Sequence, residues 1–157
     1  MAHTIQYKGL SLNGVFTWQK GGQIYNLTRQ WPFNELRDVD FDQRNVATGA
    51  RKPQGFFQAF YNNIDPNTHF VEDGSFIRLR ELALNYQIPK SIVRATKLTV
   101  FETARLGIVG RNLWTRTKYS GYDPDVSGGA GDPFGFRVDN FNYPAYRTFT
   151  VMLELGY

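Results

Sequence analysis

An all-β chain of antiparallel strands is the fold class that the sequence predicts. Several long segments alternate apolar and polar residues, which is the period of a strand with one apolar face. Aromatic residues make up 16% of the 157 residues and there are 15 glycines, a composition that favours strands joined by turns. No window approaches the eighteen apolar residues of a transmembrane helix.

The last segment, Ala145 to Tyr157, carries the clearest pattern. Its apolar side contains Phe149, Val151, Leu153, Leu155 and Tyr157, and its other side contains Thr148, Thr150, Met152, Glu154 and Gly156. The segment is longer than the five or six residues of a usual soluble strand. It suits a tilted strand of an outer-membrane β-barrel, with lipid on one side and water on the other. The alternative is an edge strand of a soluble sandwich.

Further strands are expected at residues 4–7 and 10–19, joined by a tight turn at Lys8-Gly9, and at residues 75–88 and 98–116. In the strand expected at residues 75–88, one face should combine two arginines with apolar residues: Phe76, Arg78, Arg80, Leu82, Leu84, Tyr86 and Ile88. The two arginines would then have to lie outside the hydrocarbon region or inside a loop region.

Long irregular segments separate the expected strands. Residues 23–29 are expected to form one or two helical turns, residues 30–73 a loop with a short helix near 55–61, and residues 117–143 a second loop. Such loops are unusual in a compact soluble domain but are expected outside a membrane barrel. No linker divides the chain, so one domain is predicted.

The first ten residues show no basic and apolar regions of a signal peptide. We therefore expect either a cytosolic chain or the C-terminal piece of a longer exported protein. The chain has no cysteine, which excludes disulfides and thiolate metal sites. The net charge of +4 indicates a solvated basic surface rather than a nucleic-acid partner.

Candidate substrate-binding residues are aromatic and basic. Trp114, Tyr119 and Tyr122, with Phe134 and Phe136, surround a glycine-rich loop and would stack on sugar rings; the alternative is an aromatic girdle with loop packing. Arg105 and Arg111 would face the barrel interior if Leu106 and Ile108 face lipid.

Other polar residues offer little chemistry. Asp123 and Asp125 are a weak calcium candidate, and the alternative is an Asp that caps the turn at Pro124. His3 and His69 are isolated in the sequence, and nothing brings Glu81 and Asp123 to the separation that a glycosidase requires. We predict no enzyme, no metal and no cofactor.

Four segments in order carry motifs of a known family. They are the Tyr7-Lys8-Gly9 turn with Trp18 and Gly21-Gly22-Gln23-Ile24-Tyr25, then FVEDGSFIRLRELALNYQIP at 70–89, GRNLWTRTKYSGYDPDV at 110–126 and YPAYRTFTVMLELGY at 143–157. With them, the chain resembles the SusC/RagA-like TonB-linked outer-membrane transporters over essentially its whole length.

The resemblance implies a 22-stranded barrel that imports glycans or peptides, with a plug domain inside it, a SusD-like surface lipoprotein over it and energy from TonB. Residues 1–157 match the C-terminal part of the barrel domain, without plug or signal peptide. The implied location is the outer membrane of a Gram-negative, Bacteroidetes-like bacterium, in contact with its lipid. About five strands cannot close a barrel, so the chain alone is expected to transport nothing. The alternative is a soluble β-barrel or sandwich that binds carbohydrate or single-stranded nucleic acid.

Overall fold

The chain folds into two compact units, each made of segments that are distant in sequence. The computed structural model describes residues 1–59, 67–95, 101–126 and 137–157. Unit 1 comprises Met1–Gln19, Phe76–Arg116 and Ala145–Tyr157, and unit 2 comprises Lys20–Ser75 and Thr117–Pro144. This division describes packing, and the one-domain organisation stays a prediction.

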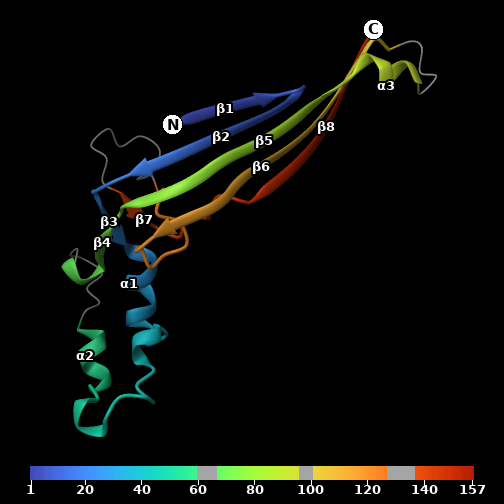
Figure 1. Ribbon diagram of the computed structural model, residues 1–157. Coiled ribbons are helices and arrows are strands. Elements are labelled where there is room, and N and C mark those ends of the chain that lie inside the picture. The colour runs from blue at the N-terminus through green and yellow to red at the C-terminus, as the bar shows by residue number, and fades with distance from the viewer. Residues whose placement is uncertain (60–66, 96–100, 127–136) are drawn as a thin grey trace. The chain divides into compact units, whose positions relative to one another are not determined.

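Unit 1 is a five-stranded sheet with the order β1-β2-β5-β6-β8 (Figure 1). Its strands are β1 (Ala2–Tyr7), β2 (Leu10–Gln19), β5 (Phe76–Ile88), β6 (Thr103–Thr117) and β8 (Thr148–Gly156). The pairs β1–β2, β2–β5 and β6–β8 are antiparallel. The predicted antiparallel strands are therefore confirmed.

Strand register gives this sheet one apolar and one polar face, because directly paired residues point to the same side. On the apolar face, Leu12 pairs with Leu84 and Ile108 pairs with Val151. On the polar face, Arg105 pairs with Glu154. The alternation predicted for residues 148–157 is thus matched by the pairing of β8 with β6.

A β-bulge in β5 changes the face of the sheet on which its arginines lie. Val15 pairs with Glu81 but the next residue, Phe16, pairs with Leu79, so the register steps over Arg80. The Nε atoms of Arg78 and Arg80 donate to hydroxyls of the polar face, on Thr115 (3.0 Å) and Thr17 (2.7 Å). The prediction that they share a face with Leu82 and Leu84 was wrong, since an extra residue in one strand reverses the facing beyond it.

Short connections lie at one end of this sheet. Lys8 and Gly9 form the β1–β2 turn with positive φ angles of 44° and 83°. Leu10, at the start of β2, pairs with Tyr86, near the end of β5. Helix α3 (Lys90–Ala95), which follows β5 after Pro89, therefore lies at the same end of the sheet as the β1–β2 turn (Figure 1). The C-terminal end of β8 lies there too, because Gly156 pairs with Thr103.

Unit 2 combines a small sheet with short helices. Its sheet has the order β4-β3-β7, from β4 (Val71–Asp73), β3 (Gln23–Asn26) and β7 (Val138–Asp139). The helices are α1 (Leu27–Asn34), α2 (Gln54–Gln58) and 3₁₀ turns at Val39–Phe41, Thr48–Ala50 and Thr68–Phe70. No helix of the described residues is long and apolar enough to span a membrane.

The predictions for this part were therefore only partly right. Residues 23–26 form a strand, although residues 27–29 begin helix α1 as expected, and residues 30–73 contain helices and strand β4 rather than one irregular loop. Their order comes from an aromatic core of Phe33, Phe57 and Phe70, with Phe41 and Phe56 packed against it. These rings are irregularly spaced in sequence, so no period reveals the core. The expected helix near 55–61 appears as α2, although residues 60 and 61 lie outside the described residues.

Candidate functional site

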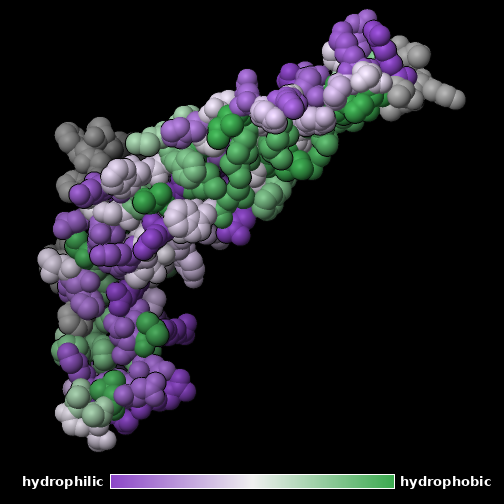
Figure 2. Space-filling view, in the orientation of Figure 1, coloured by the Kyte–Doolittle hydropathy of each residue, from purple (hydrophilic) through white to green (hydrophobic). Residues whose placement is uncertain are grey.

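The apolar face of unit 1 is exposed over all five strands. Its exposed large side chains are Ile5, Tyr7, Leu10, Phe16, Trp18, Ile77, Leu84, Tyr86, Leu106, Ile108, Phe149, Val151, Leu153 and Leu155. Figure 2 shows hydrophobic residues gathered along this sheet. A surface of this extent indicates an interaction with a membrane or another protein surface, because soluble monomers rarely expose contiguous apolar patches beyond a few hundred Å².

The polar face carries the two predicted interior arginines. Arg105 donates to the Glu154 carboxylate (3.2 Å) and to the Gln87 side-chain oxygen (3.3 Å). Arg111 pairs with Glu81 at 2.9 Å. Arg105 also lines a cavity of about 620 Å³ beside the β1–β2 turn, together with polar residues of β1, β2 and β5. Both arginines lie on the face opposite Leu106 and Ile108, as the alternation along this strand predicts.

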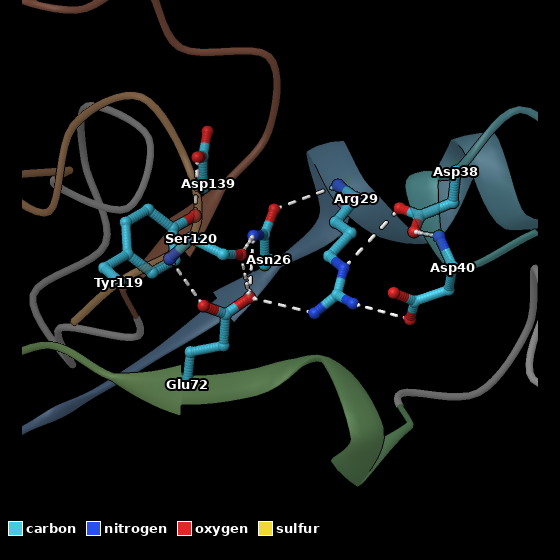
Figure 3. Close-up of polar contacts among 8 residues, drawn as sticks. All are labelled: Asn26, Arg29, Asp38, Asp40, Glu72, Tyr119, Ser120 and Asp139. Atoms are coloured by element: carbon cyan, nitrogen blue, oxygen red, sulfur yellow. Dashed lines mark hydrogen bonds and ion pairs between the residues drawn. The ribbon is translucent and has the colours of Figure 1, made fainter. Parts of the chain in front are cut away.

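In unit 2, a polar cluster joins three parts of the chain around Glu72 (Figure 3). One carboxylate oxygen of Glu72 accepts from the Asn26 side chain (2.9 Å) and the Ser120 hydroxyl (2.7 Å). The other accepts from the backbone N–H of Ser120 (2.7 Å). Asn26 also caps α1 by accepting from the backbone N–H of Arg29 (2.9 Å). The cluster therefore ties α1, β4 and the segment after β6 together.

Arg29 extends this cluster toward the surface. Its guanidinium lies 3.7 Å from Glu72, 3.5 Å from Asp38 and 2.8 Å from Asp40. Burial acts to raise the pKa of Glu72, but hydrogen bonds from Ser120 and Asn26 and the charge of Arg29 together hold that pKa below its usual value. Glu72 is therefore an ionised acceptor at neutral pH.

A second anchor lies beside Glu72. The Tyr119 hydroxyl donates to Asp139 at 2.6 Å, and the other oxygen of this buried carboxylate accepts from the Thr28 hydroxyl at 3.0 Å. Burial, and then the hydrogen bond to Asp139, raise the pKa of Tyr119. Tyr119 therefore stays protonated and serves as a donor.

The sequence of this chain is similar to that of known proteins. No family model matches it. It is 27% identical to TonB-dependent receptor P3 of Formosa agariphila over 98% of its residues, and 26% identical to TonB-dependent receptor P26 of the same organism over 99%. This chain is a relative of the TonB-dependent receptors. It spans 15% of the length of the first receptor and 16% of the second.

Solved structures agree with this relationship. The RagAB peptide importer in the open-open state matches 97% of this chain at 25% identity with a TM-score of 0.63, and the chain covers 16% of it. The closed-closed state of RagAB matches 95% at 26% identity, again with a TM-score of 0.63 and 16% coverage. The predicted resemblance to the SusC/RagA family is confirmed. These relatives are named as receptors and importers, not as enzymes.

The three aromatic residues predicted to bind substrate differ from one another in their surroundings. Trp114 lies on the apolar face of unit 1, because its neighbour Thr115 accepts from Arg78 on the polar face. In unit 2, Tyr119 is 5% exposed, whereas Tyr122 is 80% exposed. Tyr122 lines a cavity of about 360 Å³ that also contains Arg29 and Asp38.

Substrate binding by these residues stays a prediction. Tyr119 offers no free ring face for stacking in this conformation, since its ring is packed with Ile24 and Val126. Phe134 and Phe136 lie outside the described residues.

The calcium candidate has the geometry of a turn. The Asp123 carboxylate accepts from the backbone N–H of Asp125 at 2.9 Å, as expected for an Asp at a turn. Within the described ranges, no three His, Asp or Glu side chains come together as metal ligands. Calcium binding by Asp123 and Asp125 stays a prediction.

Sequence reasoning missed the cluster around Glu72. Asn26 and Arg29 are far from Glu72 and Asp139 in the sequence, and no motif links them. One signal was available, since Asn26 precedes the helix as a preferred N-cap residue.

The Glu72→Gln variant is expected to destabilise unit 2 by about 1–3 kcal/mol at pH 7, because Gln offers one acceptor oxygen where Glu72 offers two. The folded-state pKa of Glu72 is lowered, so its contribution is complete above the pKa of the unfolded chain, about 4.3. That contribution is lost as pH falls through the folded-state pKa.

Hydrogen exchange of residues 23–34 against pH measures this effect. The difference between Glu72→Gln and the unmodified protein should shrink below about pH 4. Glu35→Gln is the matched control, because Glu35 is exposed in the same unit. A difference independent of pH would refute ionised Glu72 as the source of the stability.

Proposed function

We propose that this chain forms part of the barrel wall of a TonB-dependent outer-membrane importer. In this proposal, the apolar face of unit 1 contacts lipid and its polar face lines the interior. The exposed apolar face, continuous over five strands, is the observation that carries the proposal. Alternating lipid-facing and interior-facing residues are the pattern of such barrels.

Strand length supports a membrane-spanning role. Thirteen residues of β5 extend about 44 Å, at about 3.4 Å per residue, and therefore exceed an apolar band of about 25 Å even when the strand is tilted. Tyr7 and Tyr86 lie on the apolar face toward the short connections, and Trp18 and Trp114 lie toward the other end. We assign them to the aromatic girdles at the two membrane interfaces.

The orientation follows from the connections. Outer-membrane barrels have short periplasmic turns and longer extracellular loops. The Lys8-Gly9 turn and α3 therefore face the periplasm, and the opposite ends of these strands face outward. Interior charges such as Arg105 and Arg111 would then meet the passing substrate.

A complete importer requires more strands than the five of this sheet. β1 and β8 are edge strands of the sheet, and further strands must pair with them to close a barrel. We propose the C-terminal part of a 22-stranded barrel that is inactive alone and works with a plug, TonB and a SusD-like lipoprotein. The substrates are glycans or peptides, and the RagAB importer supports peptides. Tyr122 is the exposed aromatic that we assign to substrate contact.

Fractionation of the source cell tests this proposal. An antibody against residues 30–70 should detect, in the outer-membrane fraction, a band several times larger than the 18.1 kDa of this chain. Its mobility should change on boiling, as expected for a closed barrel that unfolds. A band near 18 kDa in the soluble fraction would overturn the proposal and favour a free-standing module that binds carbohydrate or single-stranded nucleic acid.

A further inference from the structure

An apolar cavity of about 230 Å³ lies at the short-connection end of unit 1. Seven apolar residues line it, among them Ile92 and Val93 of α3, Ala104 of β6, and Leu153 and Leu155 of β8. Val93 and Ala104 are buried, whereas Ile92 is 51% exposed. The cavity therefore has a packed apolar floor and an open rim.

This cavity continues the apolar face of the sheet. Leu153 and Leu155 belong to both, and they are exposed on the same side as Val151. In Figure 2, the hydrophobic residues run along the sheet as far as α3, where hydrophilic residues border them. An occupant would thus be reached from the hydrocarbon that covers the apolar face.

The helix that lines the cavity also carries basic side chains. Lys90 and Arg94 are exposed and four residues apart on α3, so they lie on one side of this helix, which also contributes Ile92 and Val93 to the cavity lining. Lys90 lies 3.8 Å from Glu102, but both side chains are well exposed, so the pair is weak and leaves Lys90 available to another anion. An apolar lining and two cations on the same helix are complementary to a lipid with an anionic headgroup.

We propose that this cavity binds an anionic phospholipid of the periplasmic leaflet. Its acyl chain occupies the cavity, and Lys90 and Arg94 bind its phosphate. The inference rests on the proposed function, because it requires the sheet to be in a membrane with α3 at the periplasmic interface.

Photocrosslinking tests the site in the full-length protein. The protein is reconstituted into vesicles that contain phosphatidylglycerol with a photoreactive acyl chain, and labelled peptides are identified by mass spectrometry. Label should concentrate on residues 88–94 and 153–155. Ile92→Ser should lower this label at least about fivefold, whereas Ile5→Ser, the same change at an exposed residue of the apolar face outside the cavity, should not.

Charge reversal tests the headgroup. Lys90→Glu with Arg94→Glu should lower labelling by phosphatidylglycerol by at least about fivefold per charge and affect zwitterionic phosphatidylethanolamine less. Lys20→Glu with Arg37→Glu makes the same net change on exposed residues of unit 2 and should have little effect. Label spread evenly over the apolar face of an inserted protein would overturn this inference alone. Failure of the unmodified protein to insert would overturn the proposed function and this inference with it.

Discussion

Replacing Val151 by arginine is expected to destabilise the inserted protein by about 2–4 kcal/mol, because a guanidinium near the bilayer midplane loses its hydration. Val151 lies in the middle of β8, is 69% exposed and pairs with Ile108 on the apolar face. The membrane-inserted protein should become scarce in the outer-membrane fraction. Urea unfolding of the protein in vesicles measures the free energy directly.

Thr150→Arg is the matched control. Thr150 precedes Val151 in the same strand but pairs with Val109 on the polar face. Charged side chains are ordinary in the water-lined interior, so this variant should insert almost normally. Equal losses in the two variants would contradict the assignment of lipid and interior faces.

Replacing Phe33 by alanine is expected to destabilise unit 2 by about 3–5 kcal/mol, the usual cost of deleting a buried phenyl ring. Phe33 is 1% exposed, and its ring lies 5.4 Å from Phe41 and 5.1 Å from Phe70, centroid to centroid, with edge-to-face geometry. Such aromatic pairs add to the burial energy. Hydrogen exchange of α1 in the full-length protein should lose protection by two orders of magnitude or more.

Phe56→Ala provides the comparison. Phe56 is only partly buried and packs at the margin of the same core, against Phe57 at 5.4 Å. The loss of protection should therefore be clearly smaller. Insertion of unit 1 should survive both changes, because its strands bury their own set of contacts. If Phe33→Ala and Phe56→Ala behave alike, the core is not centred on Phe33.

The strands of unit 1 were predictable from the chain alone. Alternation along residues 148–157 defines the two faces of β8 without knowledge of any partner, because successive side chains of a strand point to opposite sides. The tight turn at Lys8-Gly9 was also predictable, because it depends on the local backbone preference of these two residues. Local patterns could not establish calcium binding by Asp123 and Asp125 or substrate contact by the aromatic residues. Both depend on how the loops fold.

Only the tertiary structure decided the rest. The face of the sheet on which Arg78 and Arg80 lie depends on the bulge, and the bulge is defined by the pairing of β5 with β2. Arg80 and its partner Thr17 on β2 are 63 positions apart in the sequence. The cluster around Glu72 joins Asn26 and Ser120, at separations of 46 and 48 positions. Local patterns encode the direction of a side chain relative to its neighbours in sequence. They do not encode which distant strand or loop will meet it, since that depends on how the whole chain packs.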